Sequence, residues 1–348
     1  MMLPCFVRVT QRLEGPALHD IPEAVRESIR SLHLQDQVRP SQTVAITAGS
    51  RGVANIDRIT RAVVDDLKAL GLTPFIVPTM GSHGEATAQG QKRILEHYGI
   101  TESAMGCPIK SSMSVVEIGK VKGTTVFCDK HAWEADHIVV VGRIKAHTDF
   151  DHEVESGLFK MMAIGLGKFD GAQRYHAYAY RLGLEYVIRS VGRQVLQSGR
   201  ILGGLAILED AWHNTGKLDA VPVEVMEQRE EENQALVKSW MGKVPMDADI
   251  LIMDEIGKNI SGAGMLLAWS RGEKEIRLPQ VGEQYRVELP LPAHPVFGER
   301  ALQFRTEVVR VFKQADGLGM AGLQSTQGRF KFVRPASWQQ SVGSTLVN

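Results

Sequence analysis

The sequence contains little cysteine and no excess of charge of either sign. Its three cysteines, Cys5, Cys107 and Cys128, are widely spaced and odd in number, which excludes a disulfide framework and a cysteine-based zinc site. This usage is typical of a reducing compartment, so we expect the protein to be cytoplasmic. Forty basic residues balance 40 acidic ones, and such a balance gives no broad surface for nucleic acid or anionic membranes.

Long apolar runs and several common catalytic motifs are also missing. The apolar segments, such as 138–142 and 161–167, fall far below the roughly 20 residues of a membrane span, and the first residues show no signal peptide. The chain has no P-loop, GxGxxG, GxSxG or HExxH motif, which argues against several common enzyme classes. We therefore expect neither a membrane nor a nucleic acid as partner.

Short apolar segments alternate with amphipathic ones along much of the chain. Such alternation predicts α/β layers, with a mainly parallel sheet and flanking helices. The predicted strands are 43–47, 75–77, 137–142 and 201–208, and helices are predicted from about residue 56 to Gly71, from the loop MGSHGE to about Tyr98, in the apolar run 156–169, at about 181–197 and around 228–233.

The length of 348 residues exceeds that of most single domains, so two domains are expected. We place the boundary near residue 240. Residues 1–240 then form an N-terminal catalytic and cofactor-binding α/β domain, and residues 241–348 form a smaller α/β domain that begins with strand 249–253. The active site is expected in the cleft between them.

Three loops that follow predicted strands carry residues able to bear a proton or a charge. They are the turns 49–52 (GSRG) and 81–84 (GSHG) and the segment 145–147 (KAH). In open α/β sheets, ligands bind outside the carboxyl ends of the strands, where such loops cluster. We expect these three loops to form one site.

His83 is the candidate general base of the second loop. Ser82 and Glu85 fit a capping box, which predicts His83 in the first turn of a helix. The helix dipole there favours an anion and a neutral imidazole, and a neutral imidazole can accept a proton. The alternative is a capped helix whose histidine only lies at the surface.

The charged groups of the other two loops either bind a ligand or are simply solvated at the surface. Arg51 can hold a carboxylate or phosphate through its planar guanidinium, or it is a solvated turn residue. The segment 143–153 gathers basic, acidic and histidine side chains. It matches no firm zinc or calcium motif, and a solvated charged loop is equally plausible.

Two further residues interrupt the pattern after residue 155. Lys160 lies inside an otherwise apolar run, where desolvation would make its amine a usable nucleophile; the alternative is that the side chain extends to the surface. His176, taken by itself, is more typical of a packed histidine than of a ligand.

The order of these features resembles the catalytic domain of the nickel-pincer-nucleotide-dependent lactate racemases. The resemblance is carried by a basic turn, a Gly-Ser-His turn, a histidine after a strand, a lysine in an apolar run and a later histidine. It covers roughly residues 10–210, and it is clearest over 75–99 and 136–176.

The resemblance implies an isomerase, a racemase or epimerase that inverts C2 of a 2-hydroxy acid. It implies a nickel-pincer nucleotide held covalently by Lys160 through a thioamide, with His176, 16 positions later (176 − 160), as the nickel ligand. His83 and His147 would be the paired acid and base, and Arg51 would orient the substrate carboxylate.

The sequence also departs from the family. Ala48 stands where the family's first loop has an acidic residue, the segment between His147 and Lys160 is longer, and the loop EIGKNISGAGM lacks the family's second-domain Gln and Lys. In that loop, Lys258 and Asn259 are expected to bind a substrate with oxygens beyond C2. Open alternatives are a sugar-acid C2 epimerase, a non-catalytic protein that binds the cofactor or a nucleotide, and a metal-assisted hydrolase built on 147–153.

Overall fold

The computed structural model describes residues 12–13, 15–146, 152–242, 323–326 and 329–332. Contacts between residues divide the chain into two compact units, Met1–Lys243 and Val244–Asn348. Most of the second unit lies outside the described residues, so the domain division expected near residue 240 stays a prediction. What is described of that unit is an antiparallel pair, β8 (Leu323–Thr326) and β9 (Arg329–Phe332).

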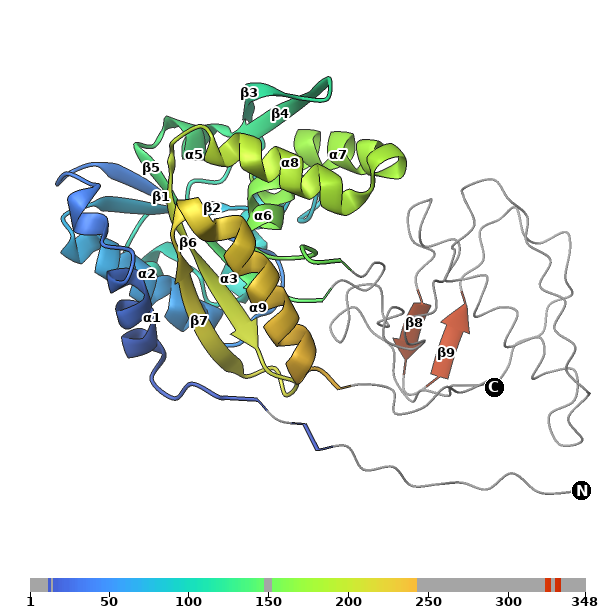
Figure 1. Ribbon diagram of the computed structural model, residues 1–348, viewed down its shortest axis with the longest axis horizontal. Coiled ribbons are helices and arrows are strands. Elements are labelled where there is room, and N and C mark those ends of the chain that lie inside the picture. The colour runs from blue at the N-terminus through green and yellow to red at the C-terminus, as the bar shows by residue number, and fades with distance from the viewer. Residues whose placement is uncertain (1–11, 14, 147–151, 243–322, 327–328, 333–348) are drawn as a thin grey trace, which may run out of the picture. The chain divides into compact units, whose positions relative to one another are not determined.

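The first unit combines a five-stranded sheet, a separate hairpin and helices (Figure 1). Its strands are β1 (Thr43–Ala48), β2 (Thr73–Pro78), β3 (Val115–Val121), β4 (Thr124–Asp129), β5 (His137–Ile144), β6 (Ile201–Glu209) and β7 (Thr215–Val221). Its helices are α1 (Ile21–Arg30), α2 (Ile56–Ala69), α3 (Ala88–His97), α4 (Glu102–Met105), α5 (Lys130–Glu134), α6 (Leu158–Lys160), α7 (Lys168–Leu182), α8 (Leu184–Leu196) and α9 (Met226–Trp240). Shorter turns are η1 (Leu34–Asp36), the π-helical η2 (Met161–Gly165) and η3 (Val223–Val225).

The sheet confirms the predicted fold class. Its strand order is β2-β1-β5-β6-β7, and the first four strands are parallel neighbours. Only β7 runs antiparallel, because a tight turn after β6 returns the chain directly along the sheet edge. The carboxyl ends of β1, β2, β5 and β6 therefore share one edge of the sheet.

Alternate side chains of the strands enter two separate hydrophobic cores. Ile46 and Val139 pack with α1 and α2 on one face, whereas Ala45 and Val140 pack with α7, α8 and α9 on the other. This follows from the two-residue period of a strand. Figure 1 shows α1 and α2 on one side of the sheet and α8 and α9 on the other. Both faces are covered, as is typical of parallel sheets.

Helix α2 agrees with the sequence prediction. The predicted helix ran from about residue 56 to Gly71, and the observed one covers Ile56–Ala69. Ile59, Val63 and Leu67 on its apolar face are buried. Gly71 has φ +80°, a conformation that a residue with a β-carbon disfavours, so the helix ends there.

Two parts of the unit differ from the prediction. The helix expected at about 181–197 begins only at Leu184, because Gly183 adopts φ +83° and separates α8 from α7. Helix α7 itself was not predicted. The stretch after Gly99, for which the sequence predicted no element before strand 137–142, contains the hairpin β3–β4, whose strands pair with each other outside the main sheet.

Candidate functional site

The loops that follow β1 and β2 are bonded to each other at the carboxyl edge of the sheet. The Thr79 backbone N–H donates to the Ala48 carbonyl at 2.7 Å, and the Thr79 hydroxyl donates to the same oxygen at 3.1 Å. The Tyr98 hydroxyl, after α3, donates to the Ser50 carbonyl at 3.2 Å. These bonds bring the Gly-Ser-Arg-Gly and Gly-Ser-His-Gly turns side by side, as the sequence predicted.

The two turns share one side-chain contact. Ser50 Oγ and His83 Nδ1 are hydrogen-bonded, and both side chains belong to loops rather than to regular elements. The bond fixes the orientation of the ring and leaves Nε2 as the second nitrogen. Sequence analysis missed Ser50; its only signal was its place in the glycine-flanked turn beside Arg51.

His83 does not lie in a helix, so the capping-box prediction was wrong. Gly84, Glu85 and Ala86 all have positive φ, between +53° and +66°, a run that a right-handed helix excludes. Helix α3 begins at Ala88, where the Thr87 hydroxyl accepts the Gly90 N–H at 3.0 Å. No helix dipole therefore acts on His83, and the imidazole ring is oriented by its hydrogen bond with Ser50 instead.

The Arg51 loop is tied to the ends of β5 and β6. Arg143 forms a 2.5 Å ion pair with Glu209 and donates to the Gly52 carbonyl at 3.1 Å. The other Glu209 oxygen accepts the Ala54 N–H at 2.7 Å. Glu209 is only 7% exposed, so this bonded pair satisfies a buried carboxylate. Arg51 itself is exposed.

Lys145 lies close enough to Arg143 and Arg51 for their charges to affect its pKa. Burial, together with the positive charges of Arg143 and Arg51, lowers the pKa of Lys145 to about 8, against the opposing effect of Glu209. A cluster of cations thus lies at the ends of β1 and β5. Such a cluster is suited to bind a carboxylate or a phosphate.

The segment that begins with Lys160 packs against the same loops. Lys160 ends the short α6, and the π-helical η2 follows directly. A β-carbon built on Gly49 would lie 3.6 Å from Met161 Cε, and one on Gly81 would lie 3.2 Å from Ile164 Cγ2. Gly81, which also has φ +56°, therefore lets η2 approach closely, whereas a β-carbon on Gly49 would make only an ordinary contact. Single π-helical turns occur frequently at functional sites.

His176 lies within electrostatic reach of Lys160. It projects from α7 with an exposed side chain, yet partial desolvation by neighbouring atoms, and then the positive charge of Lys160, lower its pKa. Lys160 and His176, which the resemblance assigned to the cofactor, therefore lie close enough for their charges to interact. An amine and an imidazole beside a glycine-lined loop pair form a donor set that fits a covalently anchored metal cofactor.

The sequence predicted a buried amine at Lys160, but the buried lysine of the structure is Lys168. Lys160 is half-buried, whereas Lys168, the first residue of α7, is completely buried. Sequence periodicity could not separate the two, because both stand in the same run of apolar and glycine residues.

Several expected site residues lie outside the described part of the chain. They are His147, Lys258 and Asn259, together with Asp149, Asp151 and Ser261. Among the described residues, no group of three or more His, Cys, Asp or Glu side chains is arranged to hold a metal ion. The metal cluster considered for 147–153 thus stays untested.

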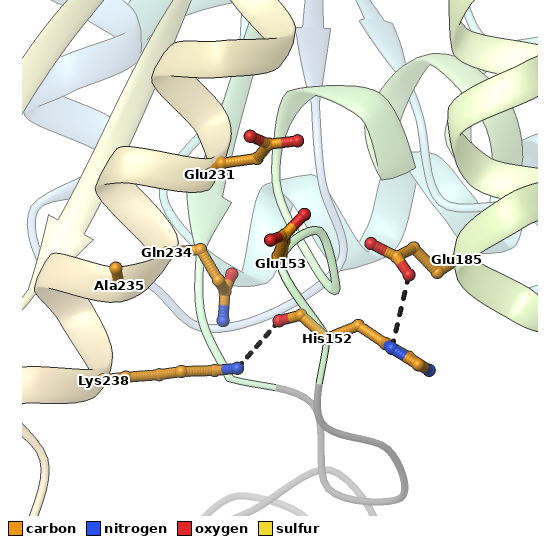
Figure 2. A pocket seen from close by; sticks show the side chains of 7 residues that line it. All are labelled: His152, Glu153, Glu185, Glu231, Gln234, Ala235 and Lys238. Carbon is orange, nitrogen blue, oxygen red and sulfur yellow. Dashed lines mark hydrogen bonds and ion pairs between the residues drawn. The ribbon is translucent and has the colours of Figure 1, made fainter.

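A pocket of about 500 Å³ is formed by helices α8 and α9 and by the end of the segment 143–153 (Figure 2). It is lined by His152, Glu153, Glu185, Glu231, Gln234, Ala235 and Lys238. The Lys238 ammonium donates to the His152 carbonyl at 2.8 Å, and Arg189 pairs with the acidic residues around the pocket. Arg189 thus offsets part of the negative charge of these carboxylates.

Comparison with known proteins gives one family. Residues 10–181 match the family model described as the lactate racemase N-terminal domain. A lactate racemase apoprotein from Thermoanaerobacterium thermosaccharolyticum is similar in structure, with 16% identity and a TM-score of 0.48, and the match covers 65% of this chain and 58% of that one. This chain thus spans less than two thirds of that relative.

Curated proteins and membrane-spanning helices add no further indication. No curated protein matches this chain, and none of the helices in the described residues is long and apolar enough to span a membrane. The cytoplasmic location stays a prediction. The family match, by contrast, covers the stretch that contains the three loops, Lys160 and His176. Residues 10–181 of this chain are therefore similar to the lactate racemase N-terminal domain.

Proposed function

We propose that this protein is an isomerase that inverts C2 of a 2-hydroxy acid with a nickel-pincer nucleotide. The observation that supports it most is the meeting of three features at one sheet edge. The bonded pair of Ser50 and His83, the cations around Arg51, and Lys160 with His176 all belong to neighbouring segments. The match to the family model and this arrangement both support the same chemistry.

Lys160 would hold the cofactor covalently, and His176 would complete the coordination of its nickel. An imidazole is a ligand that suits nickel, and the lysine amine can form the thioamide. When bound, such a group supplies reversible transfer of the C2 hydride, which side chains alone cannot perform.

The residues of the chain then bind the substrate and move protons. Arg51, with Lys145 beside it, would pair with the substrate carboxylate, because a desolvated carboxylate needs a hydrogen-bonded cation. His83, oriented by Ser50, would take the proton of the C2 hydroxyl on one face. His147 would act on the opposite face, since inversion through a planar centre needs a proton carrier on each side.

The test is chiral analysis of enantiopure 2-hydroxy acids after incubation with protein produced alongside cofactor biosynthesis. The expected result is loss of optical purity at C2, together with a cofactor mass on Lys160. Lys160→Ala should lack both. A loaded protein that inverts none of the acids would instead support the non-catalytic alternative, and an adduct on Lys168 or Lys145 would contradict the assignment of the anchor.

The substrate is proposed to be polyhydroxylated or dicarboxylic rather than lactate, as in a sugar-acid C2 epimerase. Lys258, Asn259 and Ser261 offer an ammonium, an amide and a hydroxyl within four positions (261 − 258 + 1). An unfilled polar pocket penalises a small apolar acid. Faster inversion of lactate than of gluconate or malate, unchanged in Lys258→Ala and Asn259→Ala, would show that this loop does not select the substrate.

A further inference from the structure

A buried network of polar side chains lies directly behind the candidate site. Lys168, Asp129 and Gln91 are all fully buried, at 0% exposure. The Lys168 ammonium lies 3.0 Å from Asp129 Oδ2, donates to Gln91 Oε1 at 3.1 Å, and donates to the Pro78 carbonyl at 2.5 Å. The lysine thus joins the end of β4, helix α3 and the end of β2.

The same network reaches the loop that carries His83. The Gln91 amide donates to the Gly81 carbonyl at 2.9 Å and to the His83 carbonyl at 3.3 Å. Its oxygen is the group that Lys168 holds. An unbroken chain of contacts therefore runs from Asp129 through Lys168 and Gln91 to the backbone of residue 83.

Stability alone does not explain such an arrangement. A buried ion pair is often matched or exceeded in stability by apolar residues of the same volume. A buried polar network instead favours one arrangement of the elements that it joins, because each member needs its partner in place. Lys168 also adopts φ +53°, a conformation that a residue with a β-carbon disfavours. The chain accepts this strain at the residue that joins helix α7 to the loop.

We propose that Lys168 is a positioning residue: through Gln91 it fixes the loop 79–84, and with it His83, relative to helix α7, which carries His176. The proposal rests on the proposed function for the roles of these two histidines. It adds that the distance between proton carrier and cofactor ligand is set by a buried lysine that touches neither substrate nor cofactor.

The test compares two variants of the full chain with their parent, all without cofactor. Lys168→Met alone leaves the Asp129 carboxylate buried and unpaired, so it is combined with Asp129→Asn, which keeps an oxygen for the Ala132 N–H. Gln91→Met is the second variant; it removes the donors to the Gly81 and His83 carbonyls together with the oxygen that accepts from Lys168, and it leaves Lys168 paired with Asp129. The matched control is Lys130→Met with Glu134→Gln, an exposed pair on α5.

Two measurements report on the loop rather than on overall stability. Hydrogen exchange of residues 79–87 should accelerate at least about tenfold in both variants, while β1 keeps its protection. The His83 ring resonances should also shift, because the contact with Ser50 loosens, whereas those of the exposed His97 on α3 should not. The control pair should change neither measurement.

Either variant, if it folds, tests whether Lys168 positions the loop 79–84. Unchanged exchange at 79–87 and an unchanged His83 signal would overturn the proposal, as would equal acceleration throughout β1. Because these readouts need no cofactor or substrate, they stand even if no 2-hydroxy acid is inverted. Failure of the proposed function and failure of this inference can therefore be told apart. In active enzyme, the same variants should lower kcat at least about tenfold and leave KM within about twofold.

Discussion

At the scale of single residues, the site depends on how two ionisable side chains are held. His83 is bonded through Nδ1 to Ser50, and Lys145 is brought near Arg143 and Arg51. Both belong to loops, so their surroundings come from segments far away in sequence. Their behaviour can be measured separately.

Replacement of His83 should remove one of the two proton carriers. His83→Ala is expected to lower turnover in both directions by at least about 10²-fold, the low end for lost acid–base catalysis. The fold should change little, since the side chain is exposed. His147→Ala should behave alike. Rates from each enantiomer, with exposed His97→Ala as the control, test this; normal turnover in His83→Ala would remove it from the mechanism.

Ser50 gives a graded version of the same experiment. Ser50→Ala leaves the imidazole in place and removes only the partner of Nδ1. A loss of about tenfold, in line with a single hydrogen bond, is expected. A loss as large as that in His83→Ala would mean that Ser50 itself takes part in the reaction.

Lys145 should make substrate binding depend on pH. Its pKa of about 8 lies below the ordinary 10.5, so the ammonium is present below pH 8 and is lost above it. Binding of a carboxylate should therefore weaken above pH 8 by about tenfold, roughly the contribution of one charged hydrogen bond. In Lys145→Arg the guanidinium stays charged at all these pH values, so the affinity of this variant for the carboxylate should stay constant up to pH 10. An equal decline in parent and variant would rule out Lys145 as the titrating group.

At the scale of elements, helix α9 holds the start of the Lys160 segment. Glu230 is completely buried, and one of its oxygens accepts the Phe159 N–H at 2.9 Å. A β-carbon on Gly157 would lie 2.7 Å from Glu230 Oε1, so a larger residue there would displace the Glu230 carboxyl group. The carboxyl group thus caps α6, whose last residue is Lys160.

This cap should make the fold less stable as pH rises. Burial raises the pKa of Glu230 from 4.5 to about 8, so between these values the folded chain holds a proton that the unfolded chain has lost. Stability then falls from pH 4.5 to pH 8, by about 1.4 kcal/mol per pH unit at most. Glu230→Gln keeps an acceptor oxygen and should flatten this decline in denaturant titrations. The exposed Glu224→Gln is the control; an unflattened curve in Glu230→Gln would contradict the shift.

At the scale of the whole molecule, the two compact units can be separated by experiment. Both hydrophobic cores described here lie within Met1–Lys243. A fragment of residues 1–243 should therefore unfold in one cooperative transition and carry the cofactor on Lys160. It should not invert substrate, because Lys258 and Asn259 are absent. Calorimetry, intact mass and chiral analysis test the three parts; inversion at the full rate would show that the second unit is not needed.

Much of the fold could be predicted from local patterns. Strands β1, β2, β5 and β6 and helix α2 were found because apolar periodicity reports burial within a few residues. The hairpin β3–β4 was not predicted. Strand β3 mixes apolar and polar residues and is only half-buried, and the two strands pair with each other outside the main sheet. The break at Gly183 was missed because a single glycine is tolerated inside many helices.

The sequence alone determined which residue types follow the predicted strands, and so it pointed to Arg51 and His83, while the family resemblance pointed to Lys160 and His176. Tertiary structure decided the rest. The Ser50–His83 bond, the left-handed turn after His83 and the choice of Lys168 over Lys160 as the buried lysine each depend on groups 30 or more positions apart or on packing around them. Local periodicity reports only whether a residue is covered, whereas the partner of a polar group is fixed by which distant segments meet.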